Sequence, residues 1–294
     1  MVLALIGAPA ALAVAEAARF YVVNRHNGLL LSSGERREYL LHVPASYDGT
    51  RPVPLVISLH GGALWGGAQR DISQWNAVAD REGVIVVYPS GSRSGGPRAW
   101  HVGEGGPPRD VRFIADLIDT LQARYNVDSA RIYANGLSNG GGMSFALSCT
   151  LGDRIAAVGM VGAAHLLPWD WCPDQRAVPM IAFHGTADRQ ALYRGGWTWL
   201  VRFRLPDIPT WTARWARRNG CGEGPVDSAV AADVTRRSYP GCTSDAAVVL
   251  YTVHGGGHSW PGSKPSTEWF VGRTTRSIDA TSLMWEFFRA HPLN

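Results

Sequence analysis

Short apolar segments alternate with amphipathic segments along most of this 294-residue chain. The apolar runs predict strands at 38–43, 54–59, 84–88, 131–135, 155–161, 178–183 and 248–253. Helical spacing of apolar residues predicts helices at 74–82, 109–125, 139–147 and 278–290. Because run 54–59 is uninterrupted, we expect an interior strand that is covered on both faces. The alternation predicts an α/β fold with a mostly parallel central sheet and helices on both faces.

The composition is that of a folded protein with a substantial core. Hydrophobic residues make up 46% of the chain, and we find no internal repeat and no linker between two cores. We therefore expect one domain over residues 18–294. The formal net charge is +4, and the cations are dispersed arginines with Lys264 as the single lysine. A dispersed positive surface does not favour nucleic-acid binding.

The first residues differ from the rest of the chain. Residues 2–14 are apolar and rich in alanine, and residues 13–15 match a small-x-small cleavage site. We interpret residues 1–17 as an export segment that is either cleaved or retained as a membrane anchor. No basic residue precedes Arg19, and a buried first helix is the alternative. Export predicts a secreted or extracytoplasmic protein.

The four cysteines fit an exported protein, since none has the C-x-x-C spacing of a metal or redox site. Three pairings are open. We prefer Cys221 with Cys242, because they flank one loop, together with Cys149 and Cys172. Free buried cysteines are the alternative in a reducing compartment.

A serine framed by glycines lies between strand 131–135 and helix 139–147. Residues 136–140 read Gly-Leu-Ser-Asn-Gly, the pattern of a nucleophile elbow. Side chains two residues from the serine would collide in this sharp turn, which explains Gly136 and Gly140. The turn exposes the Ser138 hydroxyl at a helix N-terminus, where N–H groups stabilise negative charge. In a chain with 34 glycines the motif alone is weak evidence.

An acid and a base follow later strands in the order serine, acid, histidine. Serine needs a base to take its proton, and a carboxylate holds that base. Asp188 follows strand 178–183, and His258 lies in a glycine-rich loop after strand 248–253. We predict Ser138 as nucleophile, Asp188 as acid and His258 as base.

Other candidates are less well placed. His254 ends its strand but lacks the reach of His258. We expect four histidines to be structural: His60, His101, His165 and His184. Four aspartates do not follow a strand by a short loop: Asp174, Asp207, Asp233 and Asp245. We predict no metal, since zinc ligands four residues apart normally need a helix and three glycines separate His254 from His258.

Acyl transfer also needs two N–H donors for the oxyanion of the tetrahedral intermediate. The backbone of Asn139, the residue after the nucleophile, predicts one donor. The second should come from the loop after strand 54–59, which reads His-Gly-Gly-Ala. We choose Gly62, because a missing Cβ lets its backbone approach the substrate, and keep Ala63 as the alternative.

Four segments together resemble the polyhydroxybutyrate depolymerase/feruloyl esterase group of α/β hydrolases, which is carbohydrate esterase family 1-like. They are Leu-His-Gly-Gly at 59–62, Gly-Leu-Ser-Asn-Gly-Gly at 136–141, His-Gly-Thr-Ala-Asp at 184–188 and Gly-Gly-Gly-His-Ser-Trp-Pro-Gly at 255–262. The resemblance spans about residues 36–290. It implies the α/β-hydrolase fold, a secreted ester hydrolase without a cofactor, the triad named above and the preferred cysteine pairings.

The chain departs from this group at two places. Relatives usually have a proline after the acid, whereas residues 189–193 read Arg-Gln-Ala-Leu-Tyr. This change makes the backbone around Asp188 harder to predict. Relatives often carry a cysteine where Gly62 stands, a change that a backbone donor should tolerate.

Aromatic residues suggest where substrate binds. Region 189–220 contains Trp197, Trp199, Trp211 and Trp215. It is either a cap-like insertion that lines the pocket or a helix packed on the sheet. Trp65 and Trp260 are candidates for a wall that grips the acyl group, and their alternative role is to pack the loops that hold the triad.

We expect a serine esterase that acts through an acyl-enzyme on feruloyl, short hydroxyalkanoate or related polyester substrates. The alternatives are a peptidase of the same fold and a catalytically silent binding protein. The sequence supplies the triad for both enzymes, and it contains no extra domain that would select peptides.

Overall fold

The computed structural model describes residues 24–93, 96–101, 109–163, 169, 172, 176–198, 204–222, 224–264 and 268–293. The predicted export segment 1–17 lies outside these residues, as do His165, Asp174 and Trp199. No helix in the described ranges combines the length and apolar character that a membrane span needs.

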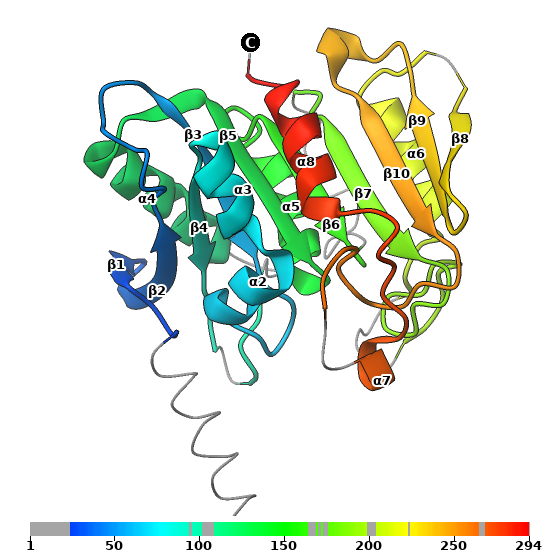
Figure 1. The fold of residues 1–294 in the computed structure, drawn as a ribbon, viewed down its shortest axis with the longest axis horizontal. Helices are drawn as coiled ribbons and strands as arrows, with labels where there is room; N and C mark the ends of the chain where they lie inside the picture. The colour runs from blue at the N-terminus through cyan, green and yellow to red at the C-terminus, as the bar shows by residue number, and fades with distance from the viewer. Residues whose placement is uncertain are drawn as a thin grey trace, which may run out of the picture.

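A ten-stranded sheet runs through the molecule in the order β1-β2-β4-β3-β5-β6-β7-β10-β9-β8 (Figure 1). The strands are β1 Gly28–Ser32, β2 Glu35–His42, β3 Val53–Leu59, β4 Ile85–Pro89, β5 Val127–Leu137, β6 Ala157–Val161, β7 Met180–Gly185, β8 Val226–Ala231, β9 Val234–Tyr239 and β10 Val248–Val253. The six strands from β4 to β10 pair in parallel, and the two strands at each edge pair antiparallel. The mostly parallel sheet predicted from the sequence is confirmed.

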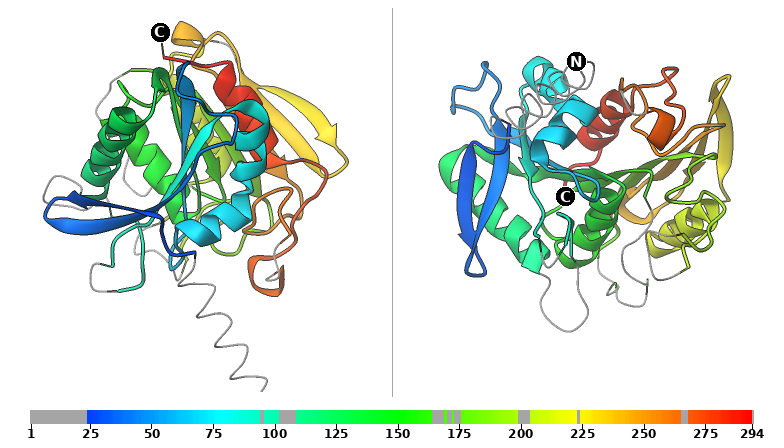
Figure 2. Two further views of the ribbon diagram at one scale, coloured as in Figure 1. Left: turned by 60° about the vertical axis from the view of Figure 1, so that its left-hand side comes forward. Right: turned by 90° about the horizontal axis from the view of Figure 1, so that it is seen from below.

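Helices cover both faces of this sheet. The helices are α2 Gly66–Ser73, α3 Trp75–Glu82, α4 Arg109–Arg124, α5 Asn139–Thr150, α6 Ile208–Arg218, α7 Glu268–Val271 and α8 Ala280–Arg289, with a short 3-10 turn η2 at Thr243–Asp245. Figure 2 shows α2, α3 and α8 on one side and α4, α5 and α6 on the other.

Alternate residues of β3 supply the two cores. Leu55 and Ile57 belong to the core that also contains the apolar sides of α4, α5 and α6, whereas Val56 belongs to the core that contains apolar residues of α3 and α8. This two-sided burial is why the segment reads as an uninterrupted apolar run.

The edge strands β1, β8 and β9 and helix α2 carry little sequence signal and were not predicted, whereas β2 corresponds to the predicted strand 38–43. The hairpin β8–β9 extends the sheet beyond β10, and all but one residue of β8 is exposed. The hairpin β1–β2 turns through Ser33 and Gly34, both with positive φ. Helix α2 begins with two glycines, and Gln74 at φ 55° separates it from α3. Edge strands and glycine-rich helices lack the apolar periodicity on which such predictions depend.

Region 189–220, interpreted from the sequence as either a cap-like insertion or a helix packed on the sheet, contains helix α6. Trp211 and Trp215 are buried against Phe145 of α5, and Trp169 completes this cluster of rings. These two tryptophans therefore pack the helix on the sheet, as one of the two interpretations predicted. Trp197, at 69% exposure, contributes nothing to this core.

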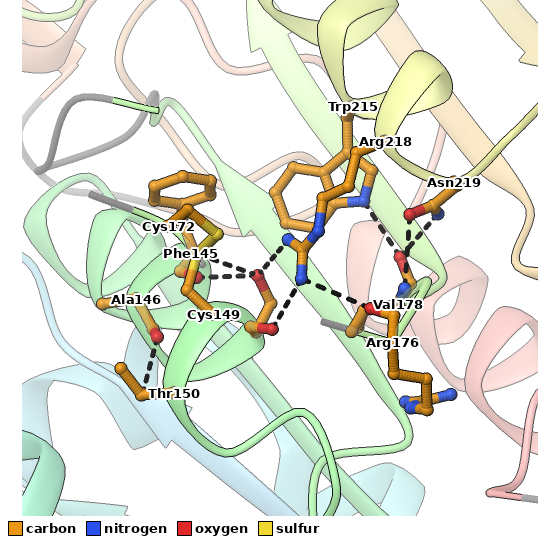
Figure 3. The surroundings of a disulfide bond; sticks show 11 residues. Phe145, Ala146, Cys149, Thr150, Cys172, Arg176, Val178, Trp215, Arg218 and Asn219 are labelled. Carbon is orange, nitrogen blue, oxygen red and sulfur yellow. Dashed lines mark hydrogen bonds between the residues drawn. A yellow bond between two sulfur atoms is a disulfide. The ribbon is translucent and has the colours of Figure 1, made fainter. Parts of the chain in front are cut away.

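Both preferred cysteine pairings are present, Cys149 with Cys172 and Cys221 with Cys242. Cys149 lies near the C-terminal end of α5, beside the aromatic cluster (Figure 3). From α6, Arg218 donates to the hydroxyl and carbonyl oxygens of Ser148 at 3.0 and 2.8 Å. The far end of α5 is thus held by a disulfide and by charge-assisted hydrogen bonds.

Candidate active site

Ser138 occupies the turn between β5 and α5, as the motif predicted. Its backbone has φ 53° and ψ −117°, a region that residues other than glycine rarely adopt. The Ser138 N–H donates to the carbonyl of Val161 at 2.8 Å. The strained turn is therefore held against the end of β6.

The two glycines of the motif are required by close backbone contacts. A Cβ on Gly136 would overlap the backbone of Gly140. A Cβ on Gly140 would overlap the carbonyl groups of Leu59 and His60. The second contact is with the end of β3, so Gly140 lets α5 start directly beside the loop predicted to bind the oxyanion.

Asp188 and His258 meet at the carboxyl ends of β7 and β10. His258 Nδ1 lies 2.7 Å from Asp188 Oδ2, and both side chains are buried. Because a carboxylate only accepts, Nδ1 carries the proton and Nε2 is left to exchange one. The predicted pairing of this acid with this base is thus present in the structure.

The second oxygen of Asp188 organises its own turn. Oδ1 accepts hydrogen bonds from the N–H groups of Gln190 and Ala191, both at 2.8 Å. Burial by itself raises the pKa of Asp188, but the hydrogen bond and charge of His258, the nearby His184 and the Ala191 N–H hold this pKa below its usual value. The segment that departs from the resembled group therefore still supports an ionised acid.

Gly162 connects the elbow to the acid and base. It directly follows Val161, which binds the Ser138 N–H. A Cβ on Gly162 would lie 3.1 Å from His258 Nδ1 and 3.4 Å from Asp188 Oδ2. The sequence reasoning missed this residue, although a glycine immediately after a predicted strand was visible.

Ser138 and His258 are thus brought to the same end of β6. No hydrogen bond between their side chains is present in the described part of the chain. Such bonds are often long without substrate and shorten in the complex. Proton transfer between these two residues stays a prediction.

The two chosen oxyanion donors lie side by side. Asn139 is the first residue of α5, where a helix leaves its N–H groups without intrahelical partners. A Cβ on Gly62 would lie 4.0 Å from the Cβ of Asn139. The Ala63 N–H is engaged by the carbonyl of Arg98 at 2.7 Å, which favours Gly62 over the alternative, Ala63.

A cavity of about 470 Å³ opens beside His258. Its apolar walls are Leu64, Trp65, Ala68, Ile72, Leu137, Trp260 and Val271. Trp65 is half-buried and lines this space. Trp260 is only 2% exposed, and its indole N–H donates to Thr281 Oγ1 of α8 at 3.0 Å, so this side chain joins the loop that carries His258 to the core beside α8.

The four other histidines that were weighed from the sequence and lie in the described ranges have structural partners. His60 Nε2 accepts from the Gly91 N–H at 2.9 Å, and its Nδ1 donates to the Gly61 carbonyl at 2.7 Å. His184 donates to the carbonyl of Ala191 at 2.6 Å. His254 lies 2.8 Å from Thr235 Oγ1, and His101 lies 2.9 Å from Ser92 Oγ.

In the described ranges, no three side chains of histidine, cysteine, aspartate or glutamate are grouped as metal ligands.

The parallel sheet, the strained serine turn and the acid–base pair at one sheet edge define an α/β hydrolase. A model of the esterase PHB depolymerase family matches residues 37–166. The acetyl xylan esterase from Aspergillus awamori has the same fold, with a TM-score of 0.62 and 16% identity over 86% of this chain and 94% of that chain.

Two relatives are similar in sequence. Feruloyl esterase B of Piromyces equi is 31% identical over 76% of this chain, and feruloyl esterase C of Emericella nidulans is 28% identical over 91%. The chain spans 42% of the length of the first and 86% of the second. Residues 37–166 thus match the esterase PHB depolymerase family, and the chain is similar to feruloyl esterases over most of its length.

Proposed function

We propose that this protein is a serine carboxylic-ester hydrolase. The observation that carries the proposal is the 2.7 Å bond between Asp188 and His258 at the sheet edge where the Ser138 elbow also lies. Its relatives' names add support, because they are feruloyl esterases.

In the proposed mechanism Ser138 Oγ attacks the ester carbonyl carbon while His258 Nε2 takes the hydroxyl proton. The carbonyl oxygen becomes an oxyanion bound by the N–H groups of Gly62 and Asn139. Asp188 holds the Nδ1–H tautomer and stabilises the imidazolium. His258 then protonates the departing alkoxide as the C–O bond breaks, which leaves an acyl-enzyme.

Water completes the cycle. His258 removes a proton from water as the oxygen attacks the acyl carbon, and a second oxyanion forms in the same site. Its collapse breaks the bond to Ser138 Oγ, and the proton on His258 returns to the serine. The products are a carboxylic acid and an alcohol, and no cofactor takes part.

We further propose that the substrates are feruloyl esters, short hydroxyalkanoate oligomers or related polyesters. This proposal is supported by the apolar cavity beside His258, which could hold a hydrophobic acyl or alcohol group. The two disulfides support an oxidising, extracytoplasmic location. The chain itself would be secreted or anchored by its N-terminal segment.

The decisive experiment compares the wild type with Ser138→Ala on methyl ferulate, p-nitrophenyl butyrate, a hydroxybutyrate oligomer and a peptide p-nitroanilide. We expect hydrolysis of at least one ester by the wild type, loss of at least a thousandfold in the variant and an unchanged circular dichroism spectrum. Labelling of Ser138 by a fluorophosphonate should agree. Residual turnover within tenfold of wild type would refute the role of Ser138, and preference for the anilide would indicate a peptidase.

A further inference from the structure

Trp100 is a buried residue that touches both sides of the proposed oxyanion hole. The residue is 2% exposed, and its indole N–H donates to the carbonyl of His60 at 2.9 Å. Its backbone N–H donates to Asn139 Oδ1 at 2.7 Å, and its carbonyl accepts from Asn139 Nδ2 at 3.2 Å. One residue thus makes three hydrogen bonds to two chain segments that are far apart in sequence.

Those two segments carry the two proposed donors. His60 begins the loop that contains Gly62, and Asn139 supplies its own backbone N–H. We propose that Trp100 is a positioning residue that fixes the separation of the Gly62 and Asn139 N–H groups. This inference rests on the proposed esterase function, because the separation matters only if an oxyanion forms between them.

The segment around Trp100 is itself well supported. Ala99 forms a β-bridge with Ser92, which fastens the segment beyond the end of β4. The backbone carbonyl of Arg98 accepts a hydrogen bond from the Ala63 N–H, so the same segment holds the loop that contains Gly62 at a second point. The segment that carries Trp100 is therefore itself held in place. We call Trp100 with its three hydrogen bonds to His60 and Asn139 the clamp.

The imidazole of His60 also holds the loop that contains Gly62. It joins the Gly61 carbonyl to the Gly91 N–H, and its ring centre lies 5.1 Å from that of Trp100. Burial lowers the pKa of His60 to about 4, which keeps it neutral so that Nε2 can accept. The carbonyl groups of His60 and Gly61 are both bound, and the peptide planes between His60 and Gly62 have little freedom to rotate.

Trp100→Phe tests the clamp because it keeps an aromatic ring but removes the N–H. The His60 carbonyl then loses its side-chain donor, and the loop can shift. Oxyanion donors act on the transition state, and a misplacement of about 1 Å can cost on the order of a hundredfold in rate. We expect kcat to fall about tenfold or more while KM changes less than threefold.

The chain offers a matched control in the same core, beside a residue that precedes β7 and away from the carboxyl strand ends that carry the proposed site. Trp215 is equally buried, and its indole N–H donates to the carbonyl of Val178 at 2.9 Å (Figure 3). Trp215→Phe removes the same kind of hydrogen bond. We expect similar losses of thermal stability in the two variants and a loss of kcat only in Trp100→Phe.

A second variant approaches the clamp from its other side. Asn139→Ala removes both side-chain hydrogen bonds to Trp100 but keeps the backbone N–H of residue 139. We expect the same loss of kcat with little change in KM. The double variant should be little worse than either single variant, because both changes release one clamp. If Trp100→Phe does not fold, Asn139→Ala alone decides the question.

The readout specific to positioning is the affinity for an oxyanion mimic. A boronic acid that forms a tetrahedral adduct with Ser138 should bind Trp100→Phe weaker by the factor lost in kcat/KM, whereas the carboxylic acid product should bind equally to both proteins. Equal kcat and boronate affinity in Trp100→Phe and Trp215→Phe would overturn the proposal while the esterase function stands. An inactive wild type would instead refute the function.

Discussion

The N–H of Ala187 donates to the carbonyl oxygen of Gly256 at 2.9 Å, which fastens the turn before the acid to the loop before the base. A second bond runs the other way, from the Gly255 N–H to Thr186 Oγ1 at 2.8 Å. These contacts do not involve the side chains of Asp188 or His258. The two turns should therefore keep their arrangement when either side chain is changed.

Asp188→Asn follows directly from this arrangement. The amide can keep the acceptor oxygen that binds the N–H groups of Gln190 and Ala191, but its NH₂ group faces His258 Nδ1. The imidazole then places its proton on Nε2, and it can no longer act as a base toward Ser138. We expect kcat to fall by roughly a thousandfold or more with an unchanged fold. Steady-state kinetics and near-ultraviolet circular dichroism measure the two effects.

Asp245→Asn is the control for that prediction. Asp245 is exposed in η2 and has φ 54°, a conformation that asparagine tolerates well. Its activity should match the wild type within twofold. An Asp188→Asn variant that keeps more than a tenth of wild-type kcat would contradict the assignment of the acid.

Gly140→Ala should be far more damaging than the size of a methyl group suggests. The new Cβ would overlap the carbonyl groups of Leu59 and His60, and these belong to a buried strand end that cannot move away cheaply. We expect a loss of about 3 kcal/mol or more in the free energy of unfolding, or failure to fold. Urea denaturation gives the difference, and Gly224→Ala, where no atom lies within 4 Å, should stay within about 0.5 kcal/mol. Equal stability of the two variants would contradict this account of the elbow.

The parallel strands and the sharp turn at Ser138 could be predicted from the sequence for one physical reason. A strand buried on both faces must be apolar throughout, and a nucleophile elbow must have glycine at set positions. Val56 and Gly140 are therefore nearly dictated by the fold. The glycine-rich loop of His258 was recognised for a related reason, since Gly257 there approaches the backbone of Val271 and Gly272 too closely for a Cβ.

Other features depended on contacts that leave no local pattern. Trp100 has no periodic neighbours, and its role is set by bonds to His60 and Asn139, which are distant in sequence. Strand β8 has no buried face, so its sequence lacks the alternation of apolar and polar residues that would predict a strand. The alternatives for Trp211 were open because a buried helix and a pocket lining both call for aromatic residues.

The free energy of unfolding should depend on pH because the pKa of His60 differs between the folded and unfolded chain. Burial lowers its pKa from 6.5 to about 4, so between these values the unfolded chain binds a proton that the folded chain does not. Stability contributed by this group is complete above pH 6.5 and is lost as the pH falls toward 4. Its loss between pH 7.5 and 4.5 should amount to about 2 to 3 kcal/mol. Asp188, whose pKa is also lowered, adds a loss of the same sign at more acidic pH.

His60→Asn isolates this contribution. The asparagine amide can still donate to the Gly61 carbonyl, but it does not titrate and leaves the Gly91 N–H without its acceptor. We expect lower stability at pH 7.5 together with a shallower decline toward pH 4.5, measured by urea unfolding at several pH values. Parallel curves for the two proteins would show that His60 is not the group responsible.

Substitutions of the two cavity tryptophans, Trp65 and Trp260, should have different effects on substrate KM. Trp65 is half-buried on the cavity wall, so Trp65→Ala removes apolar surface that a hydrophobic acyl or alcohol group would contact. Losing such contacts is worth about 1 to 2 kcal/mol, which predicts a rise in KM for aryl esters of about tenfold and a smaller rise for acetate esters. Trp260→Phe instead removes the N–H bound to Thr281, whose hydroxyl donates in turn to the carbonyl of Ser73. It should lower the melting temperature and leave the ratio of aryl to acetate KM unchanged. If Trp260→Phe shifts that ratio and Trp65→Ala does not, the substrate contacts Trp260 rather than Trp65.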